Sequence, residues 1–164
     1  MPESAPEEST TEAPRLLVID VDCPSTGELF DAVNARLLAE GAVRRSFLAA
    51  VSTREERYPT GLDFSHSRVA IPHIDPEHVI RPGLLVCRNA RSTVFRAMDD
   101  PEHHLDVRLS IWPLVTDPQN QTGMLAAVIS TLQDAASADR LLTWTPEDLE
   151  AYLTGVLAAI SAPD

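Results

Sequence analysis

The sequence predicts an α/β fold in which a central mixed sheet is flanked by helices. Short apolar runs typical of buried strands alternate along the chain with segments whose apolar residues recur at helical spacing. Strands that interleave with helices in this way are typical of a sheet covered by helical layers. Hydrophobic residues make up 44% of the 164 residues and aromatic residues only 5%, so we expect a single domain with an aliphatic core.

The first part of the chain predicts one strand and two helices. Residues 16–21 carry a continuous apolar face, which is typical of a strand. The Ser-Thr pair at 25–26 caps a helix that ends at Gly41. A second helix follows over about residues 44–57, and Pro-Thr-Gly at 59–61 breaks it. The first helix repeats apolar residues at helical spacing: Leu29, Phe30, Val33, Leu37 and Leu38.

The middle of the chain predicts three further strands. Residues 69–71 and 84–87 are short apolar runs, and residues 107–115 predict a long strand through Leu109, Ile111 and Leu114. Pro113 lies inside this long strand and cannot donate a backbone hydrogen bond, so it indicates an edge strand or a late position within the strand.

The last part of the chain predicts helices. Pro118 opens a helix whose apolar residues extend to Leu132, and a short helix around residues 138–142 follows. Thr145, with Glu147 and Asp148 in the turn that follows, starts the last helix.

Composition excludes several classes of function. The net charge of −12 and the pI of about 4.7 argue against nucleic-acid binding and disfavour binding to anionic membranes. Residues 1–14 are rich in Glu, Pro, Ser and Thr and predict a disordered tail before a folded domain at 15–164. The chain shows neither a bilayer-spanning run nor a signal peptide, and Cys23 and Cys87 fit buried free thiols, so we expect a cytoplasmic protein without direct membrane insertion.

His73 is the first candidate for chemistry. It follows the apolar run 69–71 and Pro72, which holds the backbone rigid at the strand end. A neutral imidazole is a good nucleophile near pH 7, so this residue suits a histidine that accepts and passes on a phosphoryl group. The alternative is a histidine that only caps a strand end.

Arg54 is the second candidate, because a guanidinium presents paired donors to phosphoryl oxygens. The alternative is a solvated arginine at a helix end, and Arg57 and Arg68 compete for the same role. Glu55 either pairs with Arg54 or marks a solvated helix end.

The remaining histidines support no metal site. His66, His73 and His78 lie in a loop-rich region without a metal-ligand signature, and His103 and His104 predict an exposed connection. A serine-hydrolase elbow and a phosphate-binding glycine loop are also absent from the sequence. We therefore expect no metal and no cofactor.

Several motifs together resemble a known family. Arg54-Glu55, Tyr-Pro-Thr-Gly-Leu at 58–62 and Val-Ala-Ile-Pro-His at 69–73 resemble the enzyme IIA component of the bacterial phosphoenolpyruvate-dependent sugar phosphotransferase system, of the mannitol/fructose type. The stretch at 58–62 and Glu-His-Val at 77–79 are most similar to the galactitol-like branch. The resemblance covers about residues 16–160.

The resemblance implies a five-stranded mixed sheet flanked by helices and a phosphotransferase activity. It implies that His73 takes phosphate from the phospho-histidine carrier protein and gives it to a cysteine of enzyme IIB, which serves the membrane enzyme IIC. Arg54 matches the arginine that the family places beside the phosphohistidine.

The chain departs from the family at a second histidine. Mannitol-type members carry it at the start of the helix after the last long strand, where this chain has Gln121. A glutamine amide still donates a hydrogen bond to a phosphate oxygen but cannot become charged. The segment 65–68 also departs from the family pattern and puts His66 either near the site or on a surface turn. The candidate binding residues are therefore Gln121, His66, Arg68 and His78.

Two alternatives to a sugar-transport carrier remain open. A regulatory module whose phosphorylation state controls protein partners would keep the same histidine, and a degenerate member would not be phosphorylated. The sequence does not reveal the sugar.

Overall fold

A computed structural model describes residues 14–161, with side chains to residue 157, and contains a five-stranded mixed sheet. The strand order is β1-β4-β5-β3-β2. The strands are β1 (Arg15–Val21), β2 (Gly61–Asp63), β3 (Arg68–Ala70), β4 (Gly83–Arg96) and β5 (His104–Leu114). The β1–β4 and β3–β5 pairs are parallel, whereas β4–β5 and β2–β3 are antiparallel. The predicted fold class is confirmed, and the predicted disordered tail lies outside the described residues except for Pro14.

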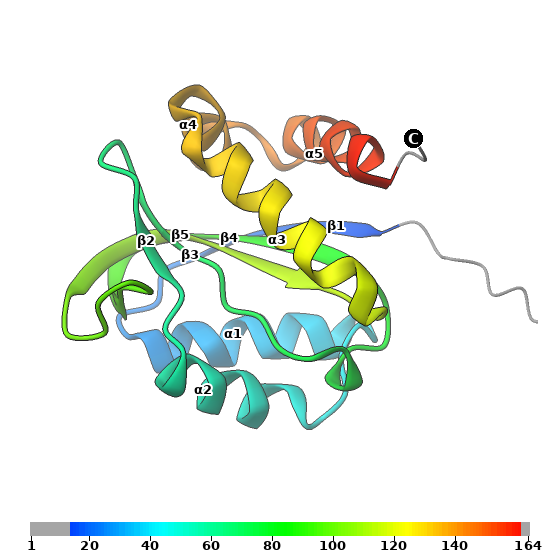
Figure 1. The fold of residues 1–164 in the computed structure, drawn as a ribbon, viewed down its shortest axis with the longest axis horizontal. Helices are drawn as coiled ribbons and strands as arrows, with labels where there is room; N and C mark the ends of the chain where they lie inside the picture. The colour runs from blue at the N-terminus through cyan, green and yellow to red at the C-terminus, as the bar shows by residue number, and fades with distance from the viewer. Residues whose placement is uncertain (1–13, 162–164) are drawn as a thin grey trace, which may run out of the picture.

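Helices cover both faces of the sheet (Figure 1). Helices α1 (Thr26–Ala39) and α2 (Phe47–Arg57) pack on one face. The other face is covered by α3 (Pro118–Gln133), α4 (Ala135–Thr143) and α5 (Pro146–Ser161). A short 3-10 turn, η1 (Pro76–His78), follows β3. Within the described range, no helix is both long and apolar enough to cross a membrane.

The sheet separates two apolar cores because neighbouring strand residues point to opposite faces. In β4, Leu85 packs toward α1 and α2, whereas Leu84 and Val86 pack toward α3, α4 and α5. The core under α1 and α2 holds Trp112, which is fully buried and packs edge-on against Phe30 with ring centroids 4.8 Å apart. The core is mainly aliphatic, as the composition predicts.

Helix α1 begins and ends where the sequence predicts. The side chain of Ser25 accepts a hydrogen bond from the backbone N–H of Glu28 at 3.2 Å, which satisfies one of the free donors of the first turn. Gly41 follows the helix with φ of +68°, a left-handed conformation that glycine adopts without steric cost. The backbone N–H of Ala42 then returns to the carbonyl of Leu37 at 2.9 Å and closes the helix end.

The strands differ from the prediction at three points. The predicted run 84–87 continues through a register shift after Arg88 into a 14-residue strand, because the polar residues that follow still pair with β5. The short β2 was missed because the Pro-Thr-Gly break reads as a turn. Pro113 lies late in β5, as predicted, but β5 is an interior strand and not an edge strand.

The two cysteines are free, but only Cys87 is fully buried, and Cys23 is half-buried.

The parallel pairing of β3 with β5 determines which loops meet. Val69 pairs with Leu109 and Ala70 with Ser110. Because parallel strands end at the same edge of a sheet, the loop after β3 and the start of α3, which follows β5, lie at one edge. This edge carries His73 on the first segment and Gln121 on the second.

Candidate functional site

His73 presents one free ring nitrogen at the edge where β3 ends. Its side chain is half-buried, and Nδ1 lies 2.8 Å from the carbonyl oxygen of Ile71. A carbonyl oxygen can only accept, so Nδ1 carries the proton and donates it. In the neutral ring the lone pair then lies on Nε2, which makes Nε2 the nucleophilic atom of this imidazole.

The electrostatic surroundings keep His73 neutral. Burial lowers the pKa of His73 below the ordinary value of 6.5, and the positive charge of Arg54 lowers it further. The hydrogen bond to Ile71 and the charge of Asp75 oppose this shift in pKa. Neutral imidazole, the form that can act as a nucleophile, therefore predominates at pH 7.

Arg54 reaches the same edge from the last turn of α2. Its Nη1 lies 3.5 Å from Oδ1 of Asp75, which is two residues after His73, and its guanidinium carbon lies 5.7 Å from the ring centroid of Tyr58. The Nε atom is buried and has no hydrogen-bond partner among the described residues. The guanidinium is thus held in place by a long ion pair and an aromatic ring, and it keeps donors available for an anion.

Gln121 enters from the first turn of α3. Asp117 caps this helix by accepting a hydrogen bond from the backbone N–H of Gln119 at 3.0 Å, and Pro118 occupies its first position. Nε2 of Gln121 lies 3.5 Å from the carbonyl oxygen of Ile74, next to His73 in the chain. The structure thus brings His73, Arg54 and Gln121 to one edge of the sheet.

The other predicted site residues lie elsewhere. His66 places Nε2 3.0 Å from the carbonyl oxygen of Gln133, and Gln133 is twelve residues from Gln121, about 18 Å along α3. Arg68 pairs with Asp63 at 3.5 Å. His78 places Nδ1 2.8 Å from Oγ of Ser46, at the far end of α2 from Arg54.

His103 and His104 are exposed, as predicted. Across residues 14–161, no group of three or more His, Cys, Asp or Glu side chains is arranged to hold a metal ion.

Sequence reasoning missed the roles of Glu55 and Thr60. Glu55 neither pairs with Arg54 nor lies in solvent, so both readings of it were wrong. Its two carboxylate oxygens accept hydrogen bonds from the backbone N–H and the side-chain hydroxyl of Thr60, at 2.8 and 2.9 Å. Burial raises the pKa of Glu55 to about 7, although these two hydrogen bonds and the charge of Arg96 lower it. Helical periodicity carries no signal for a contact made across a helix end.

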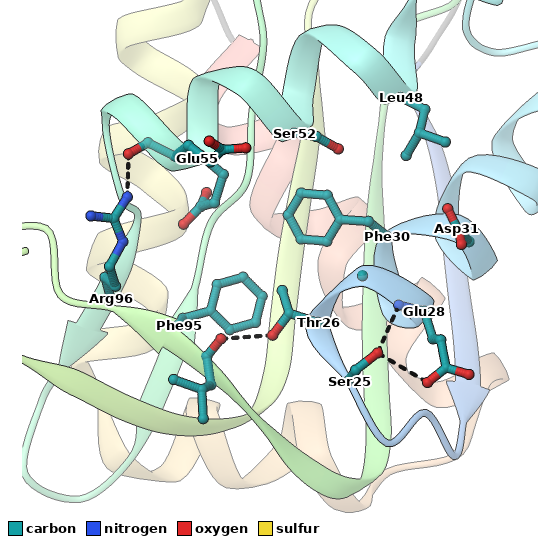
Figure 2. A pocket seen from close by; sticks show the side chains of 13 residues that line it. Ser25, Thr26, Glu28, Phe30, Asp31, Leu48, Ser52, Glu55, Phe95 and Arg96 are labelled. Atoms are coloured by element: carbon teal, nitrogen blue, oxygen red, sulfur yellow. Dashed lines mark hydrogen bonds between the residues drawn. The ribbon is translucent and has the colours of Figure 1, made fainter.

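A hollow of about 610 Å³ lies on the α1–α2 side of the sheet, where β4 ends. It is lined by the start of α1, by α2 and by residues 94–96, and Figure 2 shows Glu55 at the end nearest Arg96. His73 is not among the residues that line it. Glu55 lines the hollow and also bonds to Thr60, which lies next to the site.

Comparison with known proteins shows that this chain is a component of a phosphotransferase system. A family model described as "Phosphoenolpyruvate-dependent sugar phosphotransferase system, EIIA 2" matches residues 13–155. The chain therefore belongs to the EIIA type 2 family of this sugar phosphotransferase system, as the sequence motifs predict.

A curated relative supports the galactitol-like branch. The galactitol-specific EIIA component of Escherichia coli strain K12 is 28% identical over 127 residues, which span 77% of this chain and 84% of that protein. The same similarity is found for the galactitol-specific EIIA component of Escherichia coli O157:H7.

Solved structures share the fold. The crystal structure of IIA mannitol from Escherichia coli superimposes with a TM-score of 0.65 at 21% identity, covering 85% of this chain and 95% of that one. IIA mannitol in complex with phosphorylated IIB mannitol from Escherichia coli gives a TM-score of 0.63 at 21% identity, covering 88% and 94%. Nitrogen regulatory protein IIA-Ntr from Neisseria meningitidis gives 0.62 at 19% identity, covering 86% and 92%. At these identities the superpositions show the fold alone.

Proposed function

We propose that this protein is a phosphoryl carrier for carbohydrate uptake, with Nε2 of His73 as the acceptor atom. The lone pair of Nε2 attacks the phosphorus of a phospho-histidine on the small carrier protein. The phosphorus–nitrogen bond of the donor breaks, and its electron pair returns to the donor ring. In the second step a cysteine thiolate of enzyme IIB attacks the same phosphorus, and the bonding pair returns to Nε2 of His73.

The observation that carries this proposal is the hydrogen bond from Nδ1 of His73 to Ile71. It directs the lone pair to Nε2 and keeps the ring oriented in both steps. The lowered pKa of His73 keeps that lone pair unprotonated at neutral pH. A histidine that only capped the strand end would make the same hydrogen bond, so phosphorylation of His73 is the measurement that separates the two roles.

Arg54 stabilises the transferring group in this proposal. The phosphoryl oxygens carry negative charge throughout the reaction, and a guanidinium binds them with two parallel hydrogen bonds. The 3.5 Å separation from Asp75 is long for an ion pair, so Arg54 can turn from Asp75 to the phosphoryl group. The guanidinium carries several N–H groups in one plane, which lets it present two of them to the phosphoryl oxygens.

Gln121 supplies a neutral donor where mannitol-type relatives have a second histidine. Its amide contact to Ile74 is at the limit of hydrogen-bond length, so the amide is available to a phosphoryl oxygen. The first turn of α3 adds the positive end of a helix dipole at the same edge. Both contributions are independent of pH near neutrality.

The partners follow from this reaction. We propose that phosphate arrives from the phospho-histidine carrier protein and leaves to enzyme IIB, which serves the membrane enzyme IIC. The galactitol-specific relatives support uptake of a sugar or sugar alcohol, and the IIA–IIB complex of a protein with the same fold supports a IIB as the partner. We propose that both phosphoryl transfers take place in the cytoplasm.

The test is phosphoryl transfer from phosphoenolpyruvate through the two general enzymes, followed by intact mass. We expect wild type to gain one acid-labile phosphate, about 80 Da, and His73→Ala to gain none. His66→Ala is the matched control and should gain the phosphate. Wild type without phosphate, when both general enzymes are active, would contradict the proposal. Phosphorylated protein that passes no phosphate to a cognate IIB would favour a regulatory module.

A further inference from the structure

We propose that Glu55 and Thr60 are positioning residues for His73, which they hold in its reactive orientation through Ile71. The inference rests on the proposed role of His73 as the phosphoryl acceptor. It assigns a role to two side chains that do not touch the imidazole themselves.

We call the hydrogen-bonded series Glu55–Thr60–Ile71–His73 the brace. At its first step, both carboxylate oxygens of Glu55 accept hydrogen bonds from Thr60. Oε2 of Glu55 accepts from the backbone N–H of Thr60 at 2.8 Å, and Oε1 accepts from its hydroxyl at 2.9 Å. Thr60 is only 2% exposed. Two hydrogen bonds to a carboxylate therefore hold this threonine between the end of α2 and the sheet.

The brace continues from Thr60 to Ile71. The backbone N–H of Ile71 lies 3.2 Å from Oγ1 of Thr60 and 3.3 Å from its carbonyl oxygen, so one donor is shared by two acceptors of the same residue. Ile71 is 1% exposed. Its carbonyl oxygen then accepts the hydrogen bond from Nδ1 of His73 at 2.8 Å.

Proline makes this connection rigid. Pro72 follows Ile71 and restricts that residue to extended backbone conformations. Once Thr60 holds the N–H of Ile71, the direction of the Ile71 carbonyl is restricted as well. That direction decides where Nδ1 of His73 finds its partner, and so where Nε2 points.

The position of Glu55 disfavours a negative charge, which indicates that its carboxylate has a specific role. The residue is half-buried and lies in the last turn of α2, where the helix dipole disfavours negative charge. Arg54 and Glu56 flank it, Arg96 approaches from β4, and Glu28 and Asp31 of α1 share the hollow that it lines. Its raised pKa agrees with a carboxylate held away from water by its two bonds to Thr60.

The brace does not depend on the charge of Glu55. A neutral carboxyl group still accepts from the N–H of Thr60 and donates its own proton to Oγ1 of Thr60, which retains the bond from Ile71. A glutamine amide offers the same acceptor and donor. Glu55→Gln is therefore the conservative variant, and Glu55→Ala is the disruptive one.

The experiment combines two readouts on the full chain. One is the rate of phosphorylation by the phosphorylated carrier protein, and the other is the tautomer of His73, read from side-chain ¹⁵N shifts at pH 8 without phosphate. Glu55→Ala and Thr60→Val should slow phosphorylation about tenfold or more, because a misplacement of about 1 Å at a reacting group has effects of this size. Both should reduce the Nδ1–H fraction of His73, and the final yield should remain one phosphate.

Conservative and matched variants separate positioning from general damage. Glu55→Gln and Thr60→Ser should recover rates within about threefold of wild type, since both retain the hydrogen bonds. Thr143→Val removes an exposed hydroxyl that bonds to the carbonyl of Asp139 and should change neither readout. If Glu55→Ala does not fold, Thr60→Val decides, because it keeps the shape of the side chain and both backbone contacts of Thr60.

The outcome is decisive in each case. A wild-type rate and tautomer in Thr60→Val would overturn the inference, and so would a slower rate with an unchanged tautomer. If wild type takes no phosphate on His73, the proposed function fails, but the tautomer readout still tests the brace.

Discussion

The sheet edge after β3 and the β2–β3 hairpin carry similar residues in different states. At the edge, Nε2 of His73 accepts no hydrogen bond from a described residue and Arg54 has only a long ion pair to Asp75. On the hairpin, His66 has Nε2 against the carbonyl of Gln133, and Arg68 is paired with Asp63. A histidine and an arginine are present in both regions, but only the first leaves a nucleophilic atom and donors available. The site is distinguished less by its residue types than by having an imidazole nitrogen and guanidinium donors that are not engaged by other groups.

After loss of His73 itself, the largest effect on the phosphorylation rate is expected from substitution of Arg54. Arg54→Lys should slow phosphorylation tenfold or more, because lysine lacks the planar pair of donors. Arg68→Lys on the β2–β3 hairpin is the matched variant and should retain the wild-type rate. Single-turnover kinetics with the phosphorylated carrier would measure both. Equal rates for the two variants would remove Arg54 from the mechanism.

The second effect concerns pH. Because the pKa of His73 lies below 6.5, the rate of phosphoryl acceptance should be flat from pH 7 to 8 and fall about tenfold per unit once pH drops below that pKa. The neutral ring favours the folded state above pH 6.5, and this stability is lost as pH falls through the lowered pKa. A histidine NMR titration would measure the pKa directly. A pKa for His73 above 6.5 would contradict the described electrostatics.

Arg54→Ala sharpens the same measurement. Removing the neighbouring positive charge should raise the pKa of His73, since that charge lowers it in the native protein. Arg68→Ala is the comparison variant and should leave the His73 titration where it is. Identical titrations in the two variants would mean that Arg54 does not act on the imidazole.

The smallest effect is expected from Gln121. Gln121→Ala should slow phosphorylation a few-fold, because one neutral hydrogen bond of about 1 kcal/mol is lost. Gln133→Ala, an exposed glutamine at the far end of the same helix, should have no effect. Gln121→His should be tolerated. A large loss of thermal stability in Gln121→His would contradict an accessible position at the site.

Much of the fold could be predicted because its signals are local. Capping by Ser25, the left-handed Gly41 and helical spacing in α1 are written in adjacent residues. The extension of β4 and the short β2 could not be predicted, since polar residues and the Pro-Thr-Gly break interrupt the apolar pattern there, and only pairing with β5 and with β3 holds these segments in the sheet.

The candidate site shows the same division. His73 and Arg54 were identified from residue chemistry, and Gln121 from the family pattern. His66 and Arg68 precede His73 by only a few residues, yet they lie on the β2–β3 hairpin, where His66 contacts the last residue of α3. Glu55 and Thr60 were missed because their contact joins a helix end to a buried loop, which no periodic pattern reports.

The most direct test of the central claim is the atom that carries the phosphate. ³¹P and ¹⁵N NMR of the ¹⁵N-histidine-labelled protein, phosphorylated through the carrier, would identify it. We predict phosphorus bonded to Nε2 of His73, with Nδ1 still protonated and bonded to Ile71. Phosphate on Nδ1 of His73, or on any other residue, would contradict the account.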